Sequence, residues 1–87
     1  MKIRISLHAQ QRGRERLGLT VRQLKESAIS SLENGIDAMA DESLRPSLIR
    51  SALKHNASGI YLFQNGVFIF KEDTLVTVYP ISWLNLF

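Results

Sequence analysis

The sequence predicts one α+β domain, in which two or three N-terminal helices pack on a three- to four-stranded antiparallel β-meander. Apolar side chains recur at helical spacing in the first part of the chain. After Ser58-Gly59 the pattern changes to runs of β-branched and aromatic residues, which is typical of strands. The chain has 87 residues, enough for one hydrophobic core and too few for two, so residues 1–87 are expected to form a single domain.

A first helix is predicted from about Leu7 to Leu17, after a short strand or ordered lead-in over residues 3–6. Gly18 is well placed to terminate this helix. Thr20 and Gln23 have the spacing of a capping box, in which each side chain satisfies a backbone amide of the other residue. We therefore expect a second helix to begin directly after Thr20.

The second helix is the strongest helical signal in the chain. Its apolar residues recur at helical spacing: Val21, Leu24, Ala28, Ile29 and Leu32. Asn34-Gly35 is expected to stop the helix in a left-handed conformation. Within the segment 36–57, a short helix is predicted from about Pro46 to Lys54, because proline is tolerated in a first turn. Ser43 is the candidate cap of that helix.

A β-hairpin is predicted around Asn65-Gly66, a dipeptide typical of two-residue turns whose positions both need positive φ. The flanking strands cover residues 60–64 and 67–71. This turn sets the expected pairs as Phe63 with Phe68, Leu62 with Ile69 and Tyr61 with Phe70. Both faces of the hairpin are apolar: Tyr61, Phe63, Phe68 and Phe70 on one face, and Ile60, Leu62, Val67 and Ile69 on the other.

A second tight connection at Glu72-Asp73 leads into a third strand over residues 74–79, which Pro80 ends. The segment 81–87 is too apolar to be left in water, since it carries Trp83, Leu84, Leu86 and Phe87. We expect it to form an edge strand or a last turn packed on the sheet, or to be buried in a partner. Because small domains bury a limited fraction of their surface, a homodimer through this tail is the preferred expectation.

Composition excludes several classes of protein. The absence of cysteine rules out a disulfide scaffold, a thiolate nucleophile and a zinc knuckle. No apolar run approaches the roughly 20 residues of a membrane-spanning helix, and no secretory signal is recognisable, so a cytoplasmic protein without a membrane partner is expected. Two histidines without a carboxylate cluster predict no metal site, and no phosphate-binding glycine loop or nucleophile elbow suggests a cofactor.

The charges are distributed unevenly. Seven basic residues and one acid lie between Met1 and Lys25, whereas residues 26–44 carry five acids and no base. The net charge is +3. This asymmetry predicts an anionic partner at the N-terminal third, with nucleic acid the commonest candidate. A solvated basic face is the alternative.

A stripe of functional groups is predicted on the first helix. His8, Arg12 and Arg16 stand four residues apart and Glu15 lies beside them, so they share one helical face. Imidazole acts as a general base near neutral pH, and guanidinium groups clamp phosphate oxygens. These groups together suit metal-independent RNA cleavage. The alternative is a solvated face in which Glu15 pairs with an arginine one turn away.

A second candidate pair lies on the last strand, where Thr77 and Tyr79 share a face by the period of two. A hydroxyl and a phenol there could bind phosphate or donate a proton, although both residues are also ordinary strand formers. His55, at the end of the third helix, is expected to interact with the C-terminal carbonyls of that helix.

Four short motifs together resemble the barnase–colicin–RelE-like group of small bacterial and phage-borne ribonuclease toxins. They are His8-x-x-x-Arg12-x-x-x-Arg16, Leu17-Gly18-Leu19-Thr20, Glu33-Asn34-Gly35 and Val76-Thr77-Val78-Tyr79. The resemblance implies a helical N-terminal part before a four-stranded antiparallel sheet. It also implies that His8 is the base, that Arg12 and Arg16 clamp the phosphate, and that Thr77 and Tyr79 form the far wall of the RNA cleft. The segment 36–57 is longer and more helical than this group leads us to expect.

The sequence therefore favours a metal-independent endoribonuclease or ribonuclease-like toxin that needs no cofactor and takes RNA as its substrate. One alternative is a non-enzymatic phage or bacterial interaction protein or inhibitor. Such a protein would bind a host factor or antitoxin through its basic helix and apolar tail. Another alternative is a nucleic-acid-binding module without catalysis, since a fold does not imply a function.

Overall fold

The predicted α+β class is confirmed by the computed structural model, which describes residues 2–84 and has three helices and one five-stranded sheet. The elements follow in the order β1 (Arg4–Ile5), α1 (Leu7–Leu17), α2 (Val21–Asn34), β2 (Ile36–Asp37), α3 (Arg45–His55), β3 (Gly59–Phe63), β4 (Gly66–Lys71), β5 (Thr74–Pro80) and the 3₁₀ helix η1 (Ile81–Trp83). None of the described helices is long and apolar enough to cross a membrane.

The sheet is mixed rather than purely antiparallel, which corrects the predicted meander. Its strand order is β1-β5-β4-β3-β2. Neighbours from β2 to β5 pair antiparallel, and β1 adds a fifth strand that runs parallel to β5. Both additional strands, β1 and β2, are two residues long. β1 lies within the short strand or ordered lead-in predicted over residues 3–6, whereas no strand was predicted at β2.

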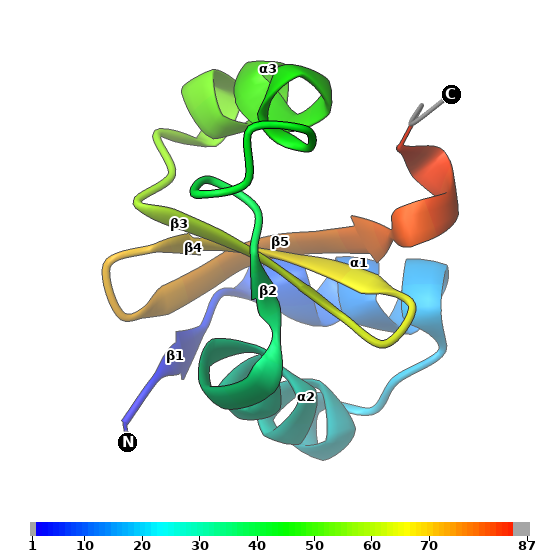
Figure 1. Ribbon diagram of the computed structural model, residues 1–87. Coiled ribbons are helices and arrows are strands. Elements are labelled where there is room, and N and C mark those ends of the chain that lie inside the picture. The colour runs from blue at the N-terminus through cyan, green and yellow to red at the C-terminus, as the bar shows by residue number, and fades with distance from the viewer. Residues whose placement is uncertain (1, 85–87) are drawn as a thin grey trace.

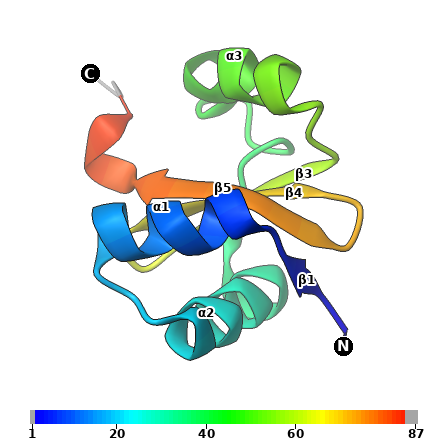
Figure 2. The same ribbon diagram turned by 180° about the vertical axis from the view of Figure 1, so that it is seen from behind.

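Helices cover both faces of the sheet. Figures 1 and 2 show α1 and α2 on one side and α3 on the other. Phe68 and Phe70 point into the core with α1 and α2, whereas Ile60, Val67 and Ile69 point into the core with α3. The two apolar faces predicted for the hairpin are confirmed, and they explain why a second helical layer, formed by α3, is present.

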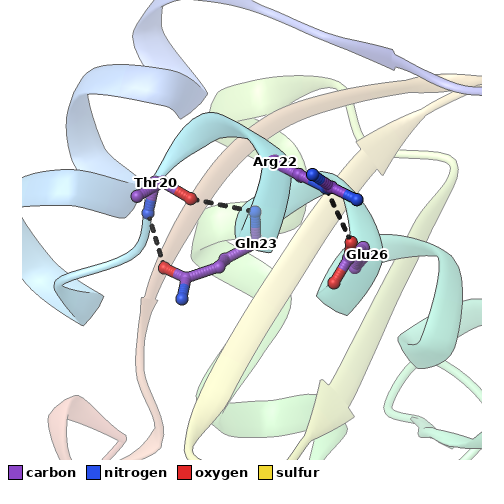
Figure 3. Close-up of polar contacts among 4 residues, drawn as sticks. All are labelled: Thr20, Arg22, Gln23 and Glu26. Carbon is purple, nitrogen blue, oxygen red and sulfur yellow. Dashed lines mark hydrogen bonds and ion pairs between the residues drawn. The ribbon is translucent and has the colours of Figure 1, made fainter.

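The boundaries of the first two helices match the sequence signals. Ser6 caps α1 by accepting a hydrogen bond from the Ala9 amide, and Gly18 ends α1 in the left-handed region, at φ 67°. The capping box of α2 is present in both directions (Figure 3): the Gln23 amide donates to Thr20 Oγ1, and the Thr20 amide donates to Gln23 Oε1. The same view shows the exposed Arg22–Glu26 ion pair on α2.

Two predicted helix boundaries are wrong in their details. Gly35 ends α2 in an extended conformation, at φ −78°, and not in a left-handed one. A Cβ at this position would lie 2.4 Å from the Ser31 carbonyl oxygen and 2.8 Å from the Leu62 carbonyl oxygen, so glycine is needed for space. Ser43 does not cap α3, because its hydroxyl and its amide both donate to Asp41.

The hairpin forms, but its turn is one residue earlier than predicted. Gln64 and Asn65 are the turn residues, Gln64 has φ 52°, and Gly66 already pairs with Phe63. The observed pairs are therefore Leu62 with Val67, Tyr61 with Phe68 and Ile60 with Ile69. The register differs from the predicted one by two residues. Such a shift keeps every side chain on its predicted face.

Tertiary contacts explain this choice of turn. The Ile81 amide donates to the Asn65 carbonyl over 2.8 Å, which ties the turn to the end of β5. A Cβ at Gly66 would lie 2.9 Å from the Phe68 ring, so this glycine provides room in β4 and does not supply a turn conformation.

The last strand and the tail agree with the sequence as far as the structure describes them. The tight connection at Glu72-Asp73 is present, and Pro80 is the final residue of β5. The tail continues as the turn η1, with Ile81 and Leu84 packed against the core on the α3 side. Leu86 and Phe87, which belong to the predicted dimer contact, lie outside the described residues.

Substitution of Gly35 tests the close approach of α2 to β3. We expect Gly35→Ala to lower the free energy of unfolding by about 1–3 kcal/mol, because the added methyl group meets two backbone carbonyls that cannot rotate away. The exposed neighbour Asn34→Ala is the control, with an expected change within about 0.5 kcal/mol. Urea titrations of the two variants make the comparison, and equal stability would contradict the steric explanation.

Candidate functional site

The outer edge of β5 is only partly covered by another strand, because β1 pairs with its first two residues. Beyond that point α1 lies along the edge (Figure 2). Two side chains of this helical segment donate to edge carbonyls of β5: Ser6 Oγ to Val76 over 3.2 Å, and Arg16 Nη1 to Val78 over 3.0 Å. These contacts satisfy carbonyls that a neighbouring strand would otherwise bind, and they fix α1 beside β5.

An open cleft of about 410 Å³ lies between α1, α3 and the end of β5. All five of the site residues predicted from the sequence line it: His8, Arg12, Arg16, Thr77 and Tyr79. The first three come from one face of α1, and the last two come from the face of β5 that packs toward α3. The docking of α1 on the strand edge is what brings the two predicted groups together.

The sequence left two arrangements open for Arg12: a place in a phosphate-binding site, or an ion pair with Glu15 on a solvated face. The structure shows elements of both. Its Nη1 contacts Glu15 Oε2 at 2.8 Å, and this hydrogen bond lowers the pKa of the Glu15 carboxyl. The same side chain also lines the cleft, and its Nε is buried without a hydrogen-bond partner in the described part of the chain. Arg12 therefore pairs with Glu15 through Nη1, while its guanidinium also contributes a cation to the cleft lining.

Arg16 is held in place by two contacts. Besides its hydrogen bond to the Val78 carbonyl, its guanidinium lies 4.8 Å from the centre of the Trp83 ring. Trp83 in turn stacks on Tyr79, with ring centroids 6.1 Å apart and planes inclined by 16°. The Trp83 side chain is 60% exposed. Arg16 is thus a fixed cation in the cleft wall, beside an aromatic surface that solvent reaches.

Strand β5 contributes two hydroxyl groups to the cleft, and only one of them has a hydrogen-bond partner. Thr77 is 2% exposed, and its Oγ1 is buried without a hydrogen-bond partner among residues 2–84. The Tyr79 hydroxyl contacts Ser51 Oγ on α3 at 3.2 Å. Burial raises the pKa of the Tyr79 phenol, so this group stays protonated at neutral pH, and it donates its proton to Ser51 Oγ. A buried hydroxyl without a partner is uncommon, and Thr77 is therefore a candidate ligand contact.

Three cleft residues on α3 were not predicted as site residues: Ser51, Lys54 and His55. His55, a basic residue in the last turn of α3, lines the cleft as well. Burial lowers the pKa of the His55 imidazole, and the charge of Lys54 acts in the same direction. The only sequence signal was that Ser51, Lys54 and His55 share one helical face, which does not show where that face points.

The cleft is electropositive. Arg12, Arg16 and Lys54 contribute three cations, and no carboxylate is among the described residues that line it. Within residues 2–84, no group of three or more histidine, cysteine, aspartate or glutamate side chains is placed to hold a metal ion. Cations, imidazoles and hydroxyl donors in one cleft suit a phosphate-bearing ligand.

Comparison with protein-family models, with curated protein sequences and with solved structures gives no significant match.

The environment of His55 predicts a pH dependence of stability. Because folding lowers its pKa from the ordinary value of 6.5, the unfolded chain binds the His55 proton more tightly, and acidification destabilises the fold. We expect His55→Gln to lose less stability than the wild-type chain between about pH 7.5 and pH 5. Denaturant titrations at a series of pH values measure this difference. Parallel curves for the two proteins would contradict the assigned environment.

Proposed function

We propose that this protein is a metal-independent endoribonuclease that cleaves RNA by attack of a 2′-hydroxyl on the adjacent phosphorus. The observation that carries this proposal is the cleft at the edge of β5, where an imidazole, fixed guanidinium groups and hydroxyl donors meet. Each of these groups has a role in phosphodiester cleavage, and the absence of carboxylates from the described lining favours a polyanionic substrate.

In this proposal His8 acts as the general base. Its imidazole removes the 2′-hydroxyl proton, the 2′-oxygen bonds to phosphorus, and the bond from phosphorus to the 5′-oxygen breaks. The products are a 2′,3′-cyclic phosphate and a 5′-hydroxyl. DNA lacks the attacking group and would not be cleaved.

Arg12 and Arg16 would stabilise the charge that develops on the phosphate oxygens. Because the Val78 carbonyl and the Trp83 ring already hold Arg16, its cation needs little reorganisation when substrate binds. The guanidinium of Arg12 adds a second cation to the cleft. On the opposite wall, the unpartnered Thr77 hydroxyl is suited to donate to the same phosphate, and the Tyr79 phenol, which donates to Ser51 Oγ in the free protein, would exchange that bond for one to the phosphate.

The proposed membership in the barnase–colicin–RelE-like group agrees with this chemistry. The order of two N-terminal helices before an antiparallel set of strands supports it, as does the meeting of His8, Arg12, Arg16, Thr77 and Tyr79. The helix α3 and the fifth strand β1 are additions to the four-stranded arrangement that the resemblance implies.

A second candidate function is a non-enzymatic interaction protein, which a different observation favours. Ile49 and Leu53 lie one turn apart on α3 and are 49% and 78% exposed, and the Trp83 ring at the tail is also exposed. Large exposed apolar side chains are typical of contact surfaces. In this alternative the chain binds an antitoxin, a host factor or a second copy of itself, and its basic cleft does not cleave RNA.

Incubation of the purified protein with total RNA in excess chelator tests the enzymatic proposal. We expect products that end in 2′,3′-cyclic phosphate, and we expect His8→Ala to lower the rate by about 10²–10⁴-fold because the general base is lost. The melting temperature of His8→Ala serves as the folding control. Failure of the wild-type protein to cleave RNA at high concentration would favour the interaction protein instead.

Salt titrations of RNA binding test the phosphate clamp. Arg12→Ala and Arg16→Ala should each weaken binding and reduce the slope of log K against log salt by about 0.7–1, which corresponds to one phosphate contact. Arg22→Ala is the charge-matched control, since Arg22 lies on α2 and pairs with Glu26 outside the cleft. An equal loss of slope in all three variants would show that binding depends on net charge alone.

A further inference from the structure

The cleft contains a second imidazole that the proposed mechanism does not use. His55, the last residue of α3, lines the same cleft as His8 on α1. The two helices lie on opposite faces of the sheet and both border the cleft at the free edge of β5, so the histidines occupy opposite walls. The cleft volume of about 410 Å³ is within the range of sites that hold a nucleotide-sized ligand, roughly 300–1,000 Å³.

We propose that His8 and His55 form an acid–base pair across the scissile phosphate, with His55 as the general acid. This inference rests on the proposed ribonuclease function and adds a catalytic residue to it. Lys54, which lines the cleft beside His55, would contact the phosphate on the leaving-group side.

The proposed cleavage of the phosphodiester needs no metal ion or co-reactant, because the two histidines accept and donate the protons that are transferred. The proton of the 2′-hydroxyl passes to neutral His8 as the bond between the 2′-oxygen and phosphorus forms. As the bond to the 5′-oxygen breaks, the imidazolium of His55 transfers its proton to that oxygen, which leaves as a hydroxyl group. His8 ends protonated and His55 neutral, and exchange with water restores both.

The charges around His55 favour its neutral form in the free protein and its protonated, acidic form when a phosphate is bound. The charged or titratable groups in the cleft with it are Lys54 on its own helix, His8, Arg12 and Arg16 on α1, and Tyr79 on β5. Burial lowers the pKa of His55 in the free protein, and the charges of Lys54, His8 and Arg16 act in the same direction. A bound phosphate supplies negative charge, offsets this repulsion and favours the imidazolium.

The unpartnered Thr77 hydroxyl supports a ligand at this position independently of either histidine. It is buried on the strand between the two histidine-bearing walls, and nothing among the described residues satisfies it. A phosphate oxygen that accepts from Thr77 would lie within the cleft that both imidazoles line.

Two substrates that differ only in their leaving group test the assignment. The dinucleotide uridylyl-3′,5′-adenosine has an alkoxide leaving group that needs a proton, whereas uridine 3′-(4-nitrophenyl phosphate) releases a phenolate that does not. We expect His55→Gln to slow cleavage of the dinucleotide by about 10²–10⁴-fold and to leave cleavage of the nitrophenyl ester within a few-fold of wild type. His8→Gln should slow both reactions. Imidazole in the buffer should partly restore dinucleotide cleavage by His55→Ala.

The outcomes separate this inference from the function on which it rests. If the wild-type protein cleaves neither substrate, the ribonuclease proposal fails and the acid–base pair fails with it. If the wild-type protein cleaves both and His55→Gln matches it on both, the ribonuclease proposal stands and His55 is not the acid. Equal losses on the two substrates, with no rescue by imidazole, would show that His55 is structural; melting curves of each variant identify misfolding.

Discussion

The docking of α1 along the free edge of β5 is the constraint on which the site depends. Strand carbonyls at a sheet edge need hydrogen-bond donors, and here a helix supplies them through Ser6 and Arg16. The direction of α1 is fixed by these two contacts, one before its first turn and one in its last. As a consequence, the helix face that carries His8 lies beside Thr77, and residues nearly 70 positions apart in sequence share one cleft.

Helix α3 forms the opposite wall of the cleft, and it is there because the β3–β4 hairpin is apolar on both faces. Because both faces of β3 and β4 are apolar, one helical layer cannot cover them, and α3 packs on the face that α1 and α2 leave open. Leu48 and Ala52 of α3 enter that core, and the Tyr79–Ser51 contact joins the helix to β5 beside the cleft. The requirement to bury a second apolar face thereby places Lys54 and His55 at the site.

Features encoded locally could be predicted from the sequence, and features set by distant contacts could not. The Thr20–Gln23 capping box, the stop at Gly18 and the two faces of the hairpin depend on neighbouring residues or on a fixed period, and they are confirmed. The position of the hairpin turn, in contrast, depends on a distant contact, since the Ile81 amide donates to the Asn65 carbonyl. The helical period places His8, Arg12 and Arg16 on one face of α1, and the strand period places Thr77 and Tyr79 on one face of β5. No local pattern shows which face of the sheet α3 covers, so the sequence does not predict that His55 lines the cleft.

The long separation between α1 and β5 also bears on when the cleft exists during synthesis. Ser6 contacts a carbonyl 70 residues later, and Arg16 contacts one 62 residues later. On a ribosome, α1 and α2 emerge well before β5, and the helix has no strand edge to dock on until β5 has left the exit tunnel. A nascent chain therefore presents its basic helix without the opposite wall. The cleft therefore forms only after β5 has emerged.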